Sequence, residues 1–217
     1  MPYSLVTDYT VLPVTLAEVK NAIKLDTSVT SDDAFLFGLI RMATDSCQDY
    51  TGLSLASQTW NLVLDCFPVM AEEWWDGVRQ GAYVRESRSY IEIDKSPVIS
   101  VTHVKTYSDA DAATTFAASK YYVDTVSKPA RVVLRNAETW PSDVLRSANG
   151  IEIQFVAGYG TSQNAIPQGL RQGILSHIAT AYEHRGDMMS PDGSFLEVPP
   201  IPVQSIILYN SKRVVRL

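Results

Sequence analysis

The sequence predicts an α+β fold: a helical bundle frame built from both ends of the chain, with a mostly antiparallel β-sheet inserted between them. Three observations predict it. Apolar residues recur every three or four positions near the N-terminus and again after residue 160, which is typical of helices. Between these segments, short runs within residues 58–160 alternate with a period of two or are rich in β-branched and aromatic residues, as strands are. A proline-punctuated stretch near the end predicts an extended C-terminal arm.

Two N-terminal helices open the predicted frame. In the first, Thr15 and Glu18 have the spacing of a capping box, in which each side chain bonds the other residue's backbone. The second helix runs over residues 31–50, starts after Thr30 or Ser31, and ends at Gly52, a plausible C-terminal stop. Its apolar stripe steps by four and three residues through Leu36, Ile40, Ala43, Cys47 and Tyr50.

The middle of the chain predicts about five or six short strands. Each segment is β-branched or aromatic and is bounded by turn residues. The segments are "SQTWNLVLDCF", "SYIEID", "VISVTHVKTYS", "KYYVDTV", "ARVVLR" and "IEIQFVA". Short turns between them favour antiparallel pairing.

A third helix is predicted after Pro167, which fits the first turn because its missing N–H costs little there. Leu170 and Ile174 begin its apolar stripe, which we expect to pack against the long N-terminal helix. Gly169 and Gly173 share one face and would allow another backbone to approach closely.

We expect a single domain with four segments: N-terminal helices in 1–57, a β-rich insertion in 58–160, a long helix in 161–187 and a C-terminal arm in 188–217. Within the insertion, residues 68–89 form a long polar segment with adjacent tryptophans, Trp74 and Trp75. These two side chains are either interface anchors or a cover for the sheet edge.

"FVAGYG", residues 155–160, stands between a strand and a helix, where nucleotide-binding loops occur. A dinucleotide fingerprint needs a third glycine at Gln163, and a P-loop needs Gly-Lys-Ser or Gly-Lys-Thr, which this chain lacks. The sequence therefore predicts a tight turn with positive φ at glycine and no nucleotide cofactor.

Catalytic, metal and membrane sites have little support. His177 and His184 share a helix face, but no third ligand or HExxH pattern accompanies them, so we expect solvated or capping histidines. Two cysteines without CxxC spacing predict buried free thiols at Cys47 and Cys66. No GxSxG motif occurs, and Glu72–Glu73 is a carboxylate pair without a signature. No apolar run approaches the ~20 residues of a membrane helix, and we expect no secretion signal.

The formal net charge of −6 argues against broad binding to phosphate backbones, which needs clustered Lys and Arg. It is compatible with a protein that lets DNA pass without holding it. The exception is the C-terminus, where Lys212, Arg213 and Arg216 stand without a nearby acid.

An ordered set of motifs resembles the head–tail connector proteins of tailed bacteriophages, also called adaptor or head-completion proteins. The early motifs are "PVTLAEVKNAIKLD", Asp32–Asp33, Tyr50–Gly52 and Gln58–Trp60. The later ones are "PVISVTHVKTY", Tyr122–Asp124, "WP" at Trp140, "FVAGYG", "IPQGLRQGILSHIATAYEHR" and "LYNSKRVVRL". The departures are the long 68–89 segment and the absence of the family's usual proline near Tyr209.

The resemblance implies a non-enzymatic virion structural protein of the neck, made in the host cytoplasm. Family members form a homo-oligomeric ring, usually a dodecamer, beneath the portal protein, extend the DNA channel and present a platform to the next neck or tail protein. The alternatives are another neck component, such as a stopper or tail-terminator, or an enzyme with unrecognised carboxylates.

The C-terminal arm is the predicted portal-binding segment. The resemblance and the basic, apolar ending together assign this role to Ile206, Ile207, Leu208, Tyr209, Lys212, Arg213, Val214, Val215, Arg216 and Leu217. We expect "VPPIPVQ" to be an extended connector and "SIILY" to be a short apolar helix or strand that needs a partner surface. We expect the arm to pair with a portal strand. The competing interpretation is a solvated, frayed terminus.

Overall fold

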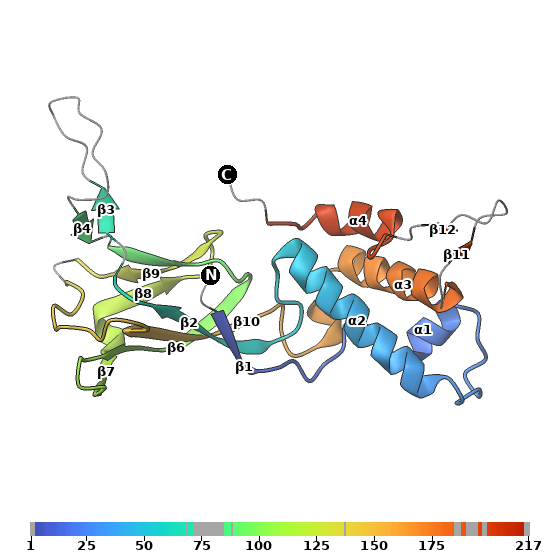
Figure 1. Ribbon diagram of the computed structural model, residues 1–217, viewed down its shortest axis with the longest axis horizontal. Helices are drawn as coiled ribbons and strands as arrows, with labels where there is room; N and C mark the ends of the chain where they lie inside the picture. Colours follow the sequence, from blue (N-terminus) through green and yellow to red (C-terminus); the bar gives the residue numbers. More distant parts are fainter. Residues whose placement is uncertain are drawn as a thin grey trace, which may run out of the picture. The chain divides into compact units, whose positions relative to one another are not determined.

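The computed structural model of the 217-residue chain describes residues 3–67, 69–71, 85–87, 89–136, 138–184, 188–189, 195–196 and 199–214. The chain forms two compact units (Figure 1). Unit 1 contains Met1–Asp8 and Gln58–Ala157, and unit 2 contains Tyr9–Ser57 and Gly158–Leu217. Strands fill unit 1 and helices fill the core of unit 2, so the predicted α+β class is confirmed.

Unit 1 contains two antiparallel sheets. The larger has the strand order β1 (Tyr3–Thr7), β2 (Gln58–Leu64), β10 (Ile151–Ala157), β6 (Val98–Tyr107) and β7 (Ala113–Phe116). The smaller has the order β5 (Tyr90–Ile93), β9 (Ala130–Leu134) and β8 (Tyr121–Asp124). Two short pairs, β3 (Val69–Ala71) with β4 (Arg85–Ser87) and β11 (Met188–Met189) with β12 (Phe195–Leu196), complete the strands of the described residues.

Alternation places one face of each sheet in a shared core. Along β10, Ile151, Ile153, Phe155 and Ala157 are fully buried, whereas the residues between them are half-buried. The inner face of the smaller sheet adds Ile91, Ile93 and Val132 to the same cluster. A buried aromatic group closes the core, with the Phe67 and Trp140 rings stacked at 4.8 Å between centroids. The alternating residues of β10 therefore lie on opposite faces of the sheet, and one of these faces is buried, as expected of half-buried strands.

All six strand segments predicted from the sequence form strands, but β1 and β7 were not predicted. Both lie at the edges of the five-stranded sheet. In β1 four of five residues are exposed, and in β7 three of four are, so neither carries the alternation that marks a half-buried strand. Trp74, Trp75 and the Glu72–Glu73 pair lie outside the described residues.

Unit 2 is built from four helices: α1 (Leu16–Ala22), α2 (Asp33–Thr51), α3 (Gln168–Glu183) and α4 (Val203–Asn210). The predicted capping box is present, because the Thr15 hydroxyl accepts from the Glu18 amide while the Glu18 carboxylate accepts from the Thr15 amide. α2 begins later than predicted, with Asp32 at its N-cap and no side-chain capping bond there. Its predicted stop is confirmed, since Gly52 is left-handed at φ 73°.

The core of unit 2 requires both ends of the chain. α3 packs against α1, α2 and α4, so the predicted packing of the long helix against α3 is confirmed. Leu36 and Ile40 of α2 and Leu170 and Ile174 of α3 are completely buried in one cluster. The close approach at Gly173 serves α4, since an added Cβ there would meet the Tyr209 ring.

The "FVAGYG" turn is a tight connection, as predicted. Gly158 and Gly160 have φ of 137° and 144°, which favour glycine. A Cβ at Gly158 would also collide with the Ala56 carbonyl, because backbone hydrogen bonds hold the turn close to the 55–57 segment. The Tyr159 amide donates to the Leu55 carbonyl at 2.9 Å and the Ser57 amide to the Gly160 carbonyl at 3.0 Å. The glycines therefore permit close backbone pairing.

Candidate functional site at the C-terminal segment

The C-terminal segment, residues 199–214, is folded onto unit 2. The prediction of an extended connector through Gln204 is wrong, because Pro202 is the N-cap of a helix that starts at Val203. The physical reason is tertiary: Ser205 and Tyr209 stand one turn apart on α4 and are both fully buried. The Ser205 hydroxyl donates to the Gly173 carbonyl of α3 at 2.9 Å. Burial of this face stabilises a helix that would be too short to persist alone.

Tyr209 is the main anchor of α4. Its ring fills the space left by the missing side chain of Gly173, and its hydroxyl lies beside the Cys47 thiol of α2. Burial raises the pKa of the Cys47 thiol to about 12 and also raises the pKa of the Tyr209 phenol. Both groups therefore stay protonated and neutral, which makes them packing groups rather than reactive ones.

Beyond α4 the chain is held at the C-terminal end of α2. The Tyr50 hydroxyl donates to the Asn210 side-chain oxygen at 2.7 Å, and the Val214 amide donates to the Thr51 carbonyl at 3.0 Å. The Arg213 guanidinium lies over the Tyr50 ring, 4.8 Å from its centroid. These contacts hold residues 210–214 against the end of α2.

The ten predicted portal-binding residues separate into three groups. Tyr209 belongs to the core, and Ile206, Leu208 and Val214 are half-buried against unit 2. Ile207, with 65% of its surface exposed, Lys212 and Arg213 are exposed. Val215, Arg216 and Leu217 lie outside the described residues.

Sequence reasoning missed Val203, which is also 65% exposed. Val203 stands one helical turn before Ile207, so the two side chains share a face only because this segment is helical.

The histidines and cysteines need two corrections. His177 was expected to be solvated or capping, but it is 2% exposed, and its Nε2 lies 3.1 Å from the Pro200 carbonyl. Burial lowers the pKa of this imidazole, so it is held neutral. His184 Nδ1 lies 3.0 Å from the Thr180 carbonyl at the end of α3, as a capping group would. Cys47 is a buried free thiol as predicted, whereas Cys66 is exposed.

Sites for other chemistry find no support in the described part of the chain. No group of three or more His, Cys, Asp and Glu there could hold a metal ion. A polar hollow of about 730 Å³ in unit 1 is lined in part by Tyr122, Arg135 and Glu138. Its one carboxylate, Glu138, pairs with Lys120 at 3.1 Å, so this hollow lacks the two carboxylates of a glycosidase. No helix within the described residues is long and apolar enough to cross a membrane.

Residues 13–108 match the family model described as phage gp6-like head-tail connector protein. This stretch is therefore similar to the gp6-like head–tail connector proteins, and the resemblance indicated by the sequence motifs is confirmed over it. No curated protein matches the chain.

Solved structures of the same fold come from gene transfer agent (GTA) particles. The neck of an empty GTA particle with C6 symmetry matches with a TM-score of 0.73 and 23% identity over 100% of this chain and 97% of that chain. The virion of a native GTA particle matches with a TM-score of 0.68 and 21% identity, and the native neck with C12 symmetry with 0.66 and 24%. Both cover 100% of this chain and 97% of theirs. The family match and this shared fold support a structural role in a phage neck.

Proposed function

We propose that the protein is a structural head–tail adaptor of a tailed bacteriophage. Copies form a ring, a dodecamer, beneath the portal, extend the DNA channel and join the capsid vertex to the next neck or tail protein. The protein works in the virion neck and is made in the host cytoplasm. The observation that carries the proposal is the head–tail connector match over residues 13–108, which runs through the N-terminal helices into the β-rich unit.

An adaptor fits better than the alternatives. A stopper or tail-terminator is expected to be β-rich, whereas half of this chain is a four-helix unit. A structural role also fits the chemistry: the described residues offer neutral buried thiol and phenol groups and paired carboxylates rather than an activated nucleophile. We therefore propose that the protein is not an enzyme and uses no cofactor.

DNA passes through the proposed ring without specific binding. Each chain carries a formal charge of −6, so twelve copies carry about −70, and an acidic or neutral channel wall repels DNA enough to let it slide.

The portal contact is assigned to the end of the C-terminal segment. Ile206–Tyr209 belong to the helix α4, which Tyr209 anchors on α3, so this segment is not available for extended pairing with a portal strand. Lys212 and Arg213 are exposed and follow the anchor points of α4, and residues 215–217 continue from them. We propose that these basic residues pair with portal carboxylates while the last apolar residues fill slots on the portal. Trp74 and Trp75 remain proposed interface anchors.

A truncation tests the portal contact. Deleting residues 212–217 removes the exposed Lys212 and Arg213 and the half-buried Val214, but none of the fully buried core residues of α4, so the melting temperature is expected to stay within a few degrees of the full chain. The truncated protein is expected to fail to join DNA-filled heads in a complementation assay, while a variant with Lys105 replaced by Ala, a half-buried β6 residue, joins them normally. Normal joining by the truncated chain would exclude the portal role of this segment.

Cryo-electron microscopy of neck particles that contain this chain tests the adaptor function itself. We expect a ring of this protein between the portal and the next neck component. A position elsewhere in the particle, or a single copy on the channel axis, would contradict the proposal.

A further inference from the structure

The polar hollow of about 730 Å³ in unit 1 lies where the central strand of the smaller sheet ends. β9 ends at Leu134, Arg135 follows it, and Ser89 directly precedes β5. The Leu134 amide donates to the Ser89 carbonyl at 2.7 Å. The Arg135 amide donates to the Lys120 carbonyl at 2.9 Å. The hollow is therefore built on hydrogen-bonded backbone, and its volume is in the usual range of ligand sites.

One positive charge in this hollow is uncompensated. The only carboxylate among its described lining residues, Glu138, pairs with the Lys120 ammonium at 3.1 Å. Arg135 is exposed, and no carboxylate of the described residues forms an ion pair with it. Its guanidinium can donate two parallel hydrogen bonds to one carboxylate. Ser89 and Asn136, which also line the hollow, add a hydroxyl and an amide as further donors.

Arg131, on β9 itself, is an arginine that unit 1 uses internally. Its guanidinium lies 2.7 Å from the Asp124 carboxylate and 5.5 Å from the centroid of the Tyr90 ring. Arg135, four residues later, makes no such contact within the described part of the chain. A guanidinium has a rigid fork of donors that suits a planar acidic partner, so Arg135 is available to a ligand from outside the chain.

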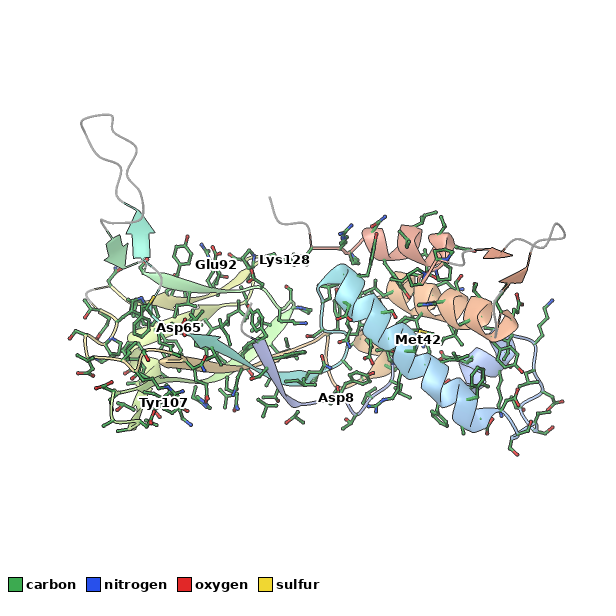
Figure 2. All side chains as sticks on the ribbon, viewed as in Figure 1. Asp8, Met42, Asp65, Glu92, Tyr107 and Lys128 are labelled. Carbon is green, nitrogen blue, oxygen red and sulfur yellow. The ribbon has the colours of Figure 1, made fainter. Side chains whose placement is uncertain are left out.

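The hollow continues onto an exposed aromatic surface. On the outer face of the smaller sheet, Val133 pairs in register with Tyr90 on one side and with Tyr122 on the other. Tyr122 is 48% exposed and lines the hollow together with Val133. Figure 2 labels Glu92, an exposed residue of the same sheet. Tyrosine and arginine are among the residues that most often anchor protein interfaces, so a polypeptide fits this surface better than a small free anion.

We infer that the hollow binds an aspartate or glutamate side chain of a partner protein. Arg135 forms the ion pair, Ser89 and Asn136 donate to the carboxylate, and Tyr122 packs against the chain that carries it. A phosphate of duplex DNA is the weaker candidate, because the hollow offers one uncompensated cation on a chain of net charge −6. The inference adds a contact in unit 1 to the proposed adaptor function, and it rests on that function only for the place where the partner is met, the neck.

Zero-length cross-linking tests the pairing directly. A water-soluble carbodiimide joins a primary amine to a carboxylate in contact with it, whereas a guanidinium does not react. Arg135→Lys keeps the positive charge and supplies the amine. Neck particles that contain this variant are expected to show, by mass spectrometry, an amide between position 135 and an aspartate or glutamate of another polypeptide. The unmodified chain is expected to give no product at that position.

Two ion pairs within the chain calibrate the reaction. Lys120 and Glu138 lie 3.1 Å apart, so their cross-link is expected in every sample. Arg131→Lys is the matched control and is expected to couple only to Asp124, in the isolated chain as in particles. Coupling of Arg135→Lys to Glu138 alone, or no product at position 135 where the 120–138 product forms, would overturn the inference. Neck particles without a ring of this protein would instead contradict the adaptor function, and with it the place given to the partner.

Charge reversal gives an independent readout. Arg135 is exposed and has no ion pair to lose within the described residues, so Arg135→Glu is expected to leave the melting temperature nearly unchanged. Assembly into infectious particles is expected to fall at least ~10-fold, since two carboxylates then face each other. Lys128→Glu, at an exposed position in the turn between β8 and β9, changes the net charge equally and is expected to assemble normally.

Normal assembly of Arg135→Glu, or an equal defect in Lys128→Glu, would overturn the inference. A gel shift in which the unmodified protein binds duplex DNA and Arg135→Glu does not would also overturn it, because the hollow would then be a phosphate site.

Discussion

The two units differ in how far apart in the sequence the segments lie that form their cores. Most of unit 1 comes from one continuous stretch, Gln58–Ala157, in which three strand pairs, β3–β4, β6–β7 and β8–β9, join consecutive strands. Unit 2 joins 9–57 to 158–217, so α3 and α4 meet α1 and α2 only after the whole β-rich unit has been made. Because ordering distant segments costs more chain entropy, the core of unit 2 depends more strongly on a few specific contacts.

The buried polar groups show the same difference. Unit 2 buries Lys20, whose Nζ lies 2.7 Å from the Val29 carbonyl and 2.6 Å from the Asp33 carboxylate. It also buries Gln48, whose side-chain oxygen accepts from the Leu55 amide at 3.1 Å. The core strands of unit 1 bury mainly aliphatic and aromatic side chains. A polar group that has lost its partner costs more than a lost apolar contact, so unit 2 is the unit in which single changes should matter most.

The largest expected effect separates the two units. Tyr209→Ala removes a fully buried aromatic side chain and is expected to lower the free energy of unfolding of unit 2 by about 3–5 kcal/mol. Hydrogen-exchange mass spectrometry should show lost protection in α2 and α3, while β2, β6 and β10 keep theirs. Tyr122→Ala, at a position 48% exposed in β8, is the control and is expected to cost less than about 0.5 kcal/mol. Equal loss of protection in both units after Tyr209→Ala would show that their stabilities are not separable.

A pair of glycines gives the next effect. At Gly173 an added Cβ would lie 2.5 Å from Cε1 of Tyr209, so Gly173→Ala is expected to displace α4 and to destabilise unit 2 by about 1–2 kcal/mol. At Gly169 nothing lies within 4 Å, so Gly169→Ala is expected to be neutral or to stabilise by up to about 1 kcal/mol. Urea unfolding monitored by circular dichroism measures both. Similar midpoints for the two variants would contradict the close packing of α4 on Gly173.

The smallest expected effect concerns pH. Burial lowers the pKa of His177 from its usual 6.5. Below that pH, His177 is therefore protonated in the unfolded chain but stays neutral in the folded protein until the pH reaches its lowered pKa. Stability from this group is complete above about pH 6.5 and falls as the pH drops, by at most about 1.4 kcal/mol per pH unit. Urea midpoints at about pH 7.5 and pH 5.5 should differ less in His177→Gln than in the unmodified protein. His184→Gln is the control, and a pH response of His177→Gln equal to that of the unmodified protein would refute the assignment.

Patterns that extend over many residues predicted much of this protein correctly. The stripe through Leu36, Ile40 and Cys47 indicated α2, and the alternation of "IEIQFVA" indicated β10, because periodicity records which face is buried. The Thr15–Glu18 capping box and the Gly52 stop were readable because both act within one helical turn. The ordered motifs also indicated the head–tail connector family, which the match over residues 13–108 bears out.

The features that the sequence could not determine depend on partners far along the chain. "VQSIILYN" follows three prolines in four residues and is too short for a stable isolated helix, yet it is helical because Gly173 leaves room for Tyr209. β1 and β7 are strands because they pair with β2 and β6 at the two edges of the sheet, although their own residues lack alternation. By itself the sequence determined the periodic elements, their local caps and the resemblance to the head–tail connector proteins. Only the tertiary structure decided which faces those elements leave exposed, because exposure is set by what packs against a residue and not by the residue alone.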